Sequence, residues 1–143
     1  MRKEILLLFL VIAAGLLLLG VKNRVEPKPI EVQPVNKTYQ TQENSQGEVG
    51  VAATPVILSS KENTRFSLVL TTHSVDLDYD IKELSILTDD QKNEYKALSW
   101  DGGEGGHHLK GTLVFPKIVK EAKSVQLTIN GIDNIERVFK WEM

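Results

Sequence analysis

Short stretches of strictly alternating apolar and polar residues limit the fold of this chain more than any other feature. Successive side chains of a β-strand point to opposite faces of the sheet, so a period of two residues predicts a strand with one buried face. We expect such strands at residues 65–71, 109–115, 125–129 and 139–141. The side chains predicted to turn inward are Phe66, Leu68, Leu70, Leu113, Phe115, Val125, Leu127 and Ile129.

Further segments are bounded by residues that favour turns. Residues 49–58 are expected to form a first strand, interrupted near Pro55 because proline cannot donate a hydrogen bond to the ladder. Residues 85–88 and 94–98 flank a hairpin turn that we predict at residues 89–93.

Two remaining segments complete the fold prediction. Asn130-Gly131 indicates a turn before the last strand. Residues 81–84 can form either a strand or a short helical turn. A total of about seven short strands, with no helix among them, favours an immunoglobulin-like all-β sandwich over a closed barrel.

The N-terminal residues 5–21 form an uninterrupted run of apolar residues and glycine. Its length lies at the short end of the range for a helix that crosses a bilayer. A helix that is apolar on every face does not suit a small globular domain, so we expect residues 1–21 to be an uncleaved signal-anchor with one transmembrane helix. A cleaved signal peptide is the alternative, although no A-x-A-like cleavage site follows the run.

Positive charges are nearly balanced on the two sides of this apolar run, so the positive-inside rule decides little. A short tail before an apolar run is typical of an export signal. We therefore expect a single-pass protein of the cell membrane, with its domain on the extracytoplasmic side. The chain contains no cysteine, which excludes a lipoprotein anchor, disulfide bonds and thiolate metal sites.

Two regions follow the apolar run. Residues 22–47 carry three prolines and a polar run without sustained apolar periodicity, which predicts a flexible linker. Residues 48–143 are enough for one domain with one core. The net charge of −2, without a basic stripe, predicts no nucleic-acid partner. The expected partners are the membrane, through the N-terminal helix, and another protein.

Residues 100–108 read WDGGEGGHH and concentrate four glycines, two acids and two of the three histidines in one loop. Loops on a rigid scaffold often carry binding groups. We predict that His73, His107 and His108 form a metal site for Zn²⁺ or Cu²⁺, because neutral imidazoles suit both ions. Trp100 and Asp101 are predicted to contact a bound ligand. In the alternative interpretation, the histidine rings bond to carboxylates or carbonyls and only lock loops together.

Three acids, Asp76, Asp78 and Asp80, alternate with apolar residues after His73. On a strand their carboxylates would project from one face at intervals of about 7 Å. Such a face could collect a hard cation, although the spacing does not match an EF-hand loop. The alternatives are a solvated strand face or aspartates that cap turns.

Motifs for catalysis are missing from the chain. Ser74 beside His73 is not a triad geometry, and no G-x-S-x-G motif occurs. The glycine-rich loop is not followed by a predicted helix, so neither a P-loop nor a dinucleotide site is expected. We expect no enzymatic activity. The sequence favours a membrane-tethered extracytoplasmic binding module for a metal or small ligand, and the alternative is a structural or protein-interaction domain.

Several short motifs carry a resemblance. Thr72-His73-Ser74 is followed by Trp100-Asp101-Gly102 and by Gly105-Gly106-His107-His108. With these T-H-S and W-x-G…G-G-H-H motifs, residues 49–143 resemble a family of uncharacterised prokaryotic exported or membrane-anchored β-domains. The resemblance implies a shared extracytoplasmic domain and no particular activity.

Overall fold

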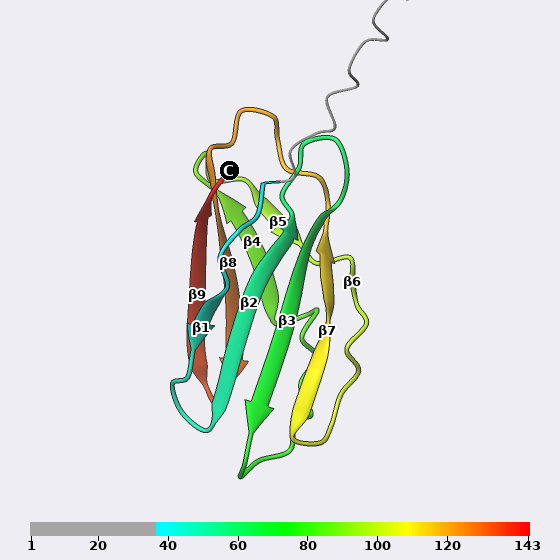
Figure 1. Cartoon of the computed structure of the whole chain (residues 1–143), viewed down its shortest axis with the longest axis vertical. Coiled ribbons are helices and arrows are strands. Elements are labelled where there is room, and N and C mark those ends of the chain that lie inside the picture. Colours follow the sequence, from blue (N-terminus) through cyan, green and yellow to red (C-terminus); the bar gives the residue numbers. More distant parts are fainter. Residues whose placement is uncertain (1–36) are drawn as a thin grey trace, which may run out of the picture. The chain divides into compact units, whose positions relative to one another are not determined.

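The computed structural model describes residues 37–143 (Figure 1). The expected membrane anchor and residues 22–36 of the expected linker lie outside the described residues. Within residues 37–143, no helix has the length and apolar character that crossing a membrane would need.

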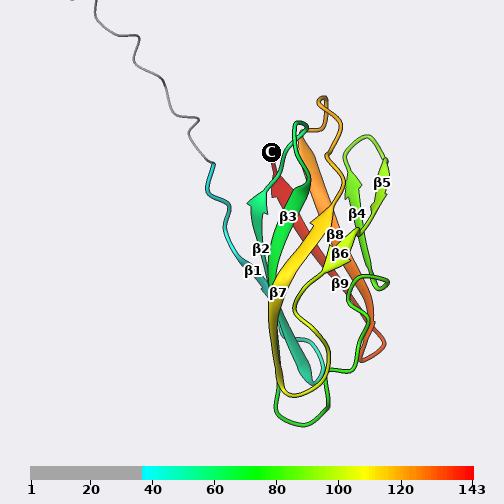
Figure 2. The same cartoon turned by 90° about the vertical axis from the view of Figure 1, so that its right-hand side faces the viewer.

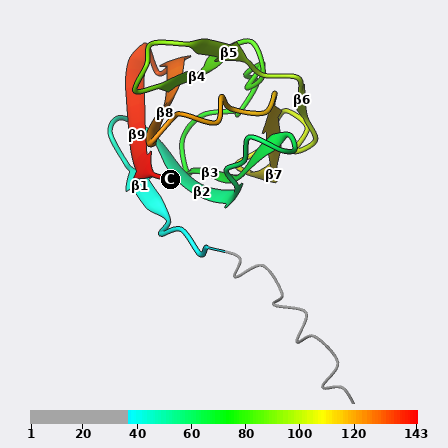
Figure 3. The same ribbon diagram turned by 90° about the horizontal axis from the view of Figure 1, so that it is seen from above.

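Two antiparallel sheets make up the described part of the chain, which confirms an all-β sandwich. The first sheet has the strand order β1-β2-β3-β7-β6, and the second has the order β5-β4-β8-β9. The strands of the first sheet are β1 (Gln42–Asn44), β2 (Val49–Ile57), β3 (Thr64–Thr72), β7 (His108–Phe115) and β6 (Ser99–Trp100). Those of the second are β5 (Glu94–Lys96), β4 (Ser85–Asp89), β8 (Ser124–Ile132) and β9 (Ile135–Glu142). Figures 2 and 3 show the two sheets facing each other.

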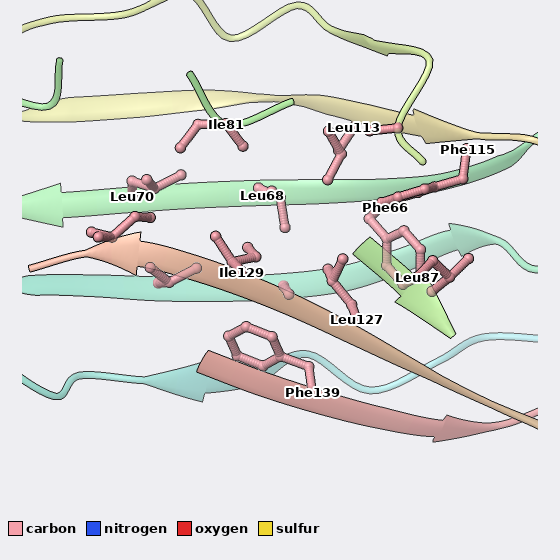
Figure 4. Packing of buried hydrophobic residues seen from close by; sticks show 14 of the residues in the cluster. Phe66, Leu68, Leu70, Ile81, Leu87, Leu113, Phe115, Leu127, Ile129 and Phe139 are labelled. Carbon is pink, nitrogen blue, oxygen red and sulfur yellow. The ribbon is translucent and has the colours of Figure 1, made fainter. Parts of the chain in front are cut away.

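The core lies between the sheets and consists of the alternating apolar residues. All eight side chains predicted to turn inward are at most 2% exposed, which confirms the prediction. Figure 4 shows several of them directed into the space between the strands. Phe66 contacts Phe115 edge-on, with ring centroids 5.9 Å apart, and also packs against Trp141. Each such side chain stabilises the fold by about 1.5–3 kcal/mol through burial.

The register shift near Pro55 and one turn confirm their predictions, whereas the predicted position of a second turn is wrong. The register of β2 shifts between Pro55 and Ile57, and residues 89–93 form the turn between β4 and β5. The turn expected at Asn130-Gly131 lies instead at Asp133 and Asn134, both with φ of 56°. Two left-handed residues in succession give the tight hairpin turn that matches the twist of paired strands. Gly131 sits in a register shift of β8, which continues to Ile132.

The end of the predicted linker belongs to the fold. Residues 42–44, which the sequence placed in the linker, form β1 and pair with β2. The Gln42 side-chain amide donates to Lys140 O and its oxygen accepts from Lys140 N (3.0 Å), so it continues the ladder of β9. The Trp141 indole N–H donates to Gln40 O (2.8 Å). This segment therefore covers the open edges of β2 and β9. Without it, the unpaired backbone groups of these edges would be exposed and could pair with another chain.

Candidate functional site

Two loops with the predicted site residues meet at one end of the sandwich, which we call the histidine end. They are residues 73–84 after β3 and residues 101–107 before β7. β3 and β7 are antiparallel neighbours with Thr71 opposite His108, so β3 ends where β7 begins (Figure 1). The described chain starts at the other end of the sandwich, where Lys37 Nζ donates to Glu142 O (3.1 Å).

Hydrogen bonds join the two loops. The Leu77 N–H donates to Gly106 O (2.9 Å), and the Gly105 N–H donates to Leu77 O (2.8 Å). The Thr72 N–H donates to His107 O (3.0 Å), and the Asp76 carboxylate accepts from the Gly106 N–H. Leu77 is completely buried in the core. The loops therefore form one clasped unit that is anchored in the sandwich.

These contacts decide between the alternatives for the acidic stretch. Residues 73–84 contain no strand, so Asp76, Asp78 and Asp80 do not share a strand face. The backbone of Leu77, between two of these acids, bonds to the glycine-rich loop, and the Asp80 carboxylate accepts from the Glu83 N–H (3.1 Å) at the start of a turn. Residues 81–84 form that short turn, which was one of the two alternatives.

The glycines have two distinct geometric roles. Gly105 and Gly106 have φ of 85° and 74°, a left-handed backbone that side chains other than glycine rarely adopt. This backbone brings their N–H groups to Leu77 O and the Asp76 carboxylate. At Gly102 a Cβ would lie 2.0 Å from the Trp100 ring, so only glycine allows the chain to lie against the indole.

Trp100 and Asp101 shape this loop. The Trp100 indole N–H donates to Gly103 O (2.8 Å), and its ring is half-buried. The Asp101 carboxylate accepts from the Thr112 N–H and so continues the pairing of β6 with β7. Both polar groups predicted to contact a ligand are engaged in hydrogen bonds within the protein.

The three histidines share one end of the molecule but not one ligand set. His73, His107 and His108 are all exposed. Among residues 37–143, no group of three His, Asp or Glu side chains is arranged to hold a metal ion. The loops are locked by backbone groups and the Asp76 carboxylate, whereas the hydrogen bonds found in the described part of the chain involve none of the imidazole rings.

A buried arginine, which the sequence reasoning missed, supports the same end. Arg137 is 0% exposed and donates to Ile132 O (2.6 Å), Gln46 O (2.7 Å) and Val49 O (2.9 Å). It thereby holds the β1–β2 turn against the β8–β9 turn. Arg137 points to the same inward side of β9 as Phe139 and Trp141. A charged residue at a core position of β9 was therefore the sequence signal that could have revealed this arginine.

Asp133 is the acidic partner of this arginine. Its Oδ2 lies 3.6 Å from Arg137 Nη2 and accepts from the N–H groups of Glu48 and Val49 (3.0 Å each). Its Oδ1 accepts from the Tyr79 hydroxyl (3.3 Å), which ties the 73–84 loop to the network. Burial lowers the pKa of Arg137, and the charge of Asp133 and then Tyr79 oppose this shift.

A second aspartate network lies at the opposite end, in the β4–β5 turn. Asp89 accepts from the N–H groups of Gln91 and Asn93, from the Asn93 amide (2.9 Å each) and from the Tyr95 hydroxyl (2.8 Å). Burial alone would raise the pKa of Asp89, but these hydrogen bonds together outweigh it and lower the pKa.

Comparisons with known proteins assign this chain to no family. No protein-family model and no curated protein matches this chain. Among solved structures, a DUF4426 family protein from Pseudomonas aeruginosa PAO1 is similar over 72% of this chain and 92% of that chain, at 11% identity and a TM-score of 0.45. A likeness this distant carries no argument about fold or function, and the family resemblance of the T-H-S and W-x-G motifs stays a prediction.

Proposed function

We propose that this chain is a non-enzymatic protein-interaction module, tethered to the extracytoplasmic face of the cell membrane by residues 5–21. Its histidine end is the surface that meets a protein partner. This surface presents three exposed imidazoles, those of His73 and His107 on the clasped loops and that of His108 at the start of β7.

The observation that carries this proposal is the placement of the clasped loops. Their backbone is fixed by hydrogen bonds to each other, and they lie at the opposite end of the sandwich from Lys37, where the described chain starts. A preorganised loop pair loses little conformational entropy when a partner binds. We therefore expect a partner to bind the end of the sandwich that lies away from Lys37.

The strand order supports an immunoglobulin-like assignment within this proposal. The series β2-β3-β7-β6 corresponds to the order A-B-E-D of such domains, and β5-β4-β8-β9 corresponds to C′-C-F-G. β1 would then be an additional strand beside A. Domains of this architecture carry their binding loops at the ends of the sandwich, which agrees with a role for the histidine end.

A metal or small-ligand site on the same loops has less support. The described residues hold no three-group ligand set, and Trp100 and Asp101 already bond within the loop. A nearby hollow over Gly50 and Ala52 measures about 210 Å³ and is open to solvent. Pockets that bind small molecules usually have a larger volume, about 300–1,000 Å³.

Site-specific photo-cross-linking in intact cells tests the proposal. A photoreactive amino acid replaces His107 in the full chain, and a matched exposed residue at the other end, Glu121, in a second version. We expect one adduct of defined mass from position 107 and none from position 121. Equal adducts from both ends, or none from position 107, would refute the assignment of the histidine end.

A further inference from the structure

The outer face of the first sheet has a small hollow beside the histidine end. It lies over β1, β2 and β3, which are neighbours in this sheet (Figure 1), and it measures about 210 Å³. The half-buried Gly50, Ala52 and Val69 line its floor, and the exposed Glu43, Ser45 and Thr71 line its rim. A cavity of about 150 Å³ can hold a benzene ring, so this hollow has room for one side chain.

Gly50 keeps the hollow open although the backbone does not require a glycine there. Its φ is not positive, and it pairs with Thr71 in a regular part of the ladder, since the register of β2 shifts only later, between Pro55 and Ile57. A Cβ at Gly50 would lie 3.2 Å from Thr71 Oγ1 and 3.5 Å from Ser45 Oγ, and both exposed side chains can rotate to make room. Glycine weakens a strand, and where no bulge explains it, it often marks a site that another molecule approaches closely.

The rim of the hollow offers hydrogen-bond acceptors. Thr71 Oγ1 and Ser45 Oγ both lie close to Gly50, and Glu43 adds a carboxylate. Of the residues that line the hollow, Glu43 alone is charged. Within residues 37–143, its carboxylate makes no ion pair and no hydrogen bond. The hollow therefore combines an apolar floor with one free negative charge.

Charges elsewhere on this face leave the hollow negative. Lys110 and His108 on β7 lie two strands away from Ala52 and Gly50, in the same rows of register partners, and neither lines the hollow. With strands about 4.8 Å apart this is about 10 Å, a distance at which salt largely screens exposed charges. Glu48 in the β1–β2 turn is a further acid. The row that ends at His108 connects the hollow with the histidine end.

We propose that this hollow receives an arginine side chain of the protein that binds the histidine end. The apolar stem of the arginine lies over Ala52 and Val69. Its guanidinium group pairs with the Glu43 carboxylate and donates further hydrogen bonds to the hydroxyl groups of Ser45 and Thr71. Arginine suits this role better than lysine because its planar guanidinium binds a carboxylate through two parallel hydrogen bonds, and it is enriched in protein interfaces. The inference rests on the proposed function for the protein partner.

A peptide titration of the full chain in lipid nanodiscs tests the hollow without the partner. The probe is a blocked pentapeptide with arginine between two pairs of glycines, and the control peptide carries citrulline, which keeps the shape and removes the charge. We expect the arginine peptide to shift the amide NMR signals of Gly50, Ala52 and Val69 saturably, with the millimolar affinity of so small a ligand. The citrulline peptide should bind about fivefold more weakly.

Two variants separate the charge of the hollow from its shape. Glu43→Gln should weaken binding of the arginine peptide by about fivefold, whereas Glu94→Gln, an exposed acid on the equally short edge strand β5, should not change it. Gly50→Val fills the hollow and should abolish the shifts. Its control is Thr112→Val, which lies on the same face but does not line the hollow. Unchanged melting temperatures control for folding.

The outcomes also distinguish this inference from the proposed function. Absence of saturable shifts, equal binding of the two peptides, or undiminished binding of the arginine peptide in Glu43→Gln or in a folded Gly50→Val would each overturn the inference. A missing photo-cross-link at position 107 would refute the proposed function and would leave the peptide titration unaffected.

Discussion

The two ends of the sandwich each contain a tyrosine bonded to an aspartate, but the aspartates are held in different ways. At the histidine end, Asp133 binds the buried Arg137, and its other partners, Tyr79, Glu48 and Val49, come from distant parts of the chain. At the opposite end, Asp89 binds only neutral donors between residues 91 and 95. The first network joins three loops into one surface, whereas the second closes a single turn.

Removing the cation should produce the largest difference between the ends. Arg137→Met leaves the Asp133 carboxylate without its charged partner and deprives three carbonyl groups of a donor. Breaking such a buried pair lowers the free energy of unfolding by about 3–5 kcal/mol. Urea unfolding of the isolated domain, residues 37–143, measures this loss. The control Arg65→Met, at an exposed position of β3, should change it by about 0.5 kcal/mol or less. Similar losses in the two variants would contradict the role of Arg137.

The contribution of the opposite end to the stability of the fold should depend on pH and disappear at low pH. The pKa of Asp89 is lowered in the folded state, so its stabilisation is present above the unfolded pKa of about 3.9 and is lost as the pH falls through the folded value. Asp89→Asn should cost about 1–3 kcal/mol at pH 7 and flatten the loss of stability below about pH 4. Unfolding at several pH values measures both effects, with the exposed Asp78→Asn as control. An unchanged dependence on pH in Asp89→Asn would remove this explanation.

The two tyrosine hydroxyls sharpen the comparison. Tyr95 donates to Asp89 and accepts from the Val119 N–H (3.2 Å), whereas Tyr79 donates to Asp133 at a longer 3.3 Å. Tyr95→Phe leaves a backbone donor without its partner and should cost about 1–3 kcal/mol. Tyr79→Phe removes one weaker bond and should cost about 0.5–1.5 kcal/mol. Urea unfolding of both variants shows which one loses more free energy of unfolding. A larger loss in Tyr79→Phe would reverse our ranking of the two networks.

The smallest effect is expected from the histidines. Their rings are exposed, so replacing His73, His107 and His108 together with alanine should change the free energy of unfolding by about 0.5 kcal/mol or less. Added Zn²⁺ should leave the melting temperature of the original domain unchanged. A saturable rise in melting temperature that is absent in the triple variant would restore the metal interpretation.

The comparison also explains what the sequence could predict. Alternation reports which side chains face the core, so the strands around Phe66 and Leu127 and the local turn at residues 89–93 were predictable. At residues 76–80 the same pattern left a strand face and turn-capping aspartates open, because Leu77 is buried while its backbone bonds to a loop and not to a ladder.

Features that depend on distant partners escaped the sequence analysis. β1 has no apolar period, because the segment is held by its backbone and by the Gln42 amide on Lys140. Arg137 needs carbonyl groups from Gln46 and Val49, which are far away along the chain. The sequence analysis singled out the glycine-rich loop, but the groups that hold it, Asp76 and Leu77, were visible only in the structure.

Amide hydrogen exchange at Leu77, Gly105 and Gly106 tests most directly whether the histidine end is a clasped, preorganised surface. All three N–H groups donate hydrogen bonds between the two loops. We predict that they exchange slowly in the full chain, and that Asp76→Asn speeds exchange at Gly106 while β3 stays protected. Exchange of all three amides at the rate of an open loop, with β3 protected, would contradict the account.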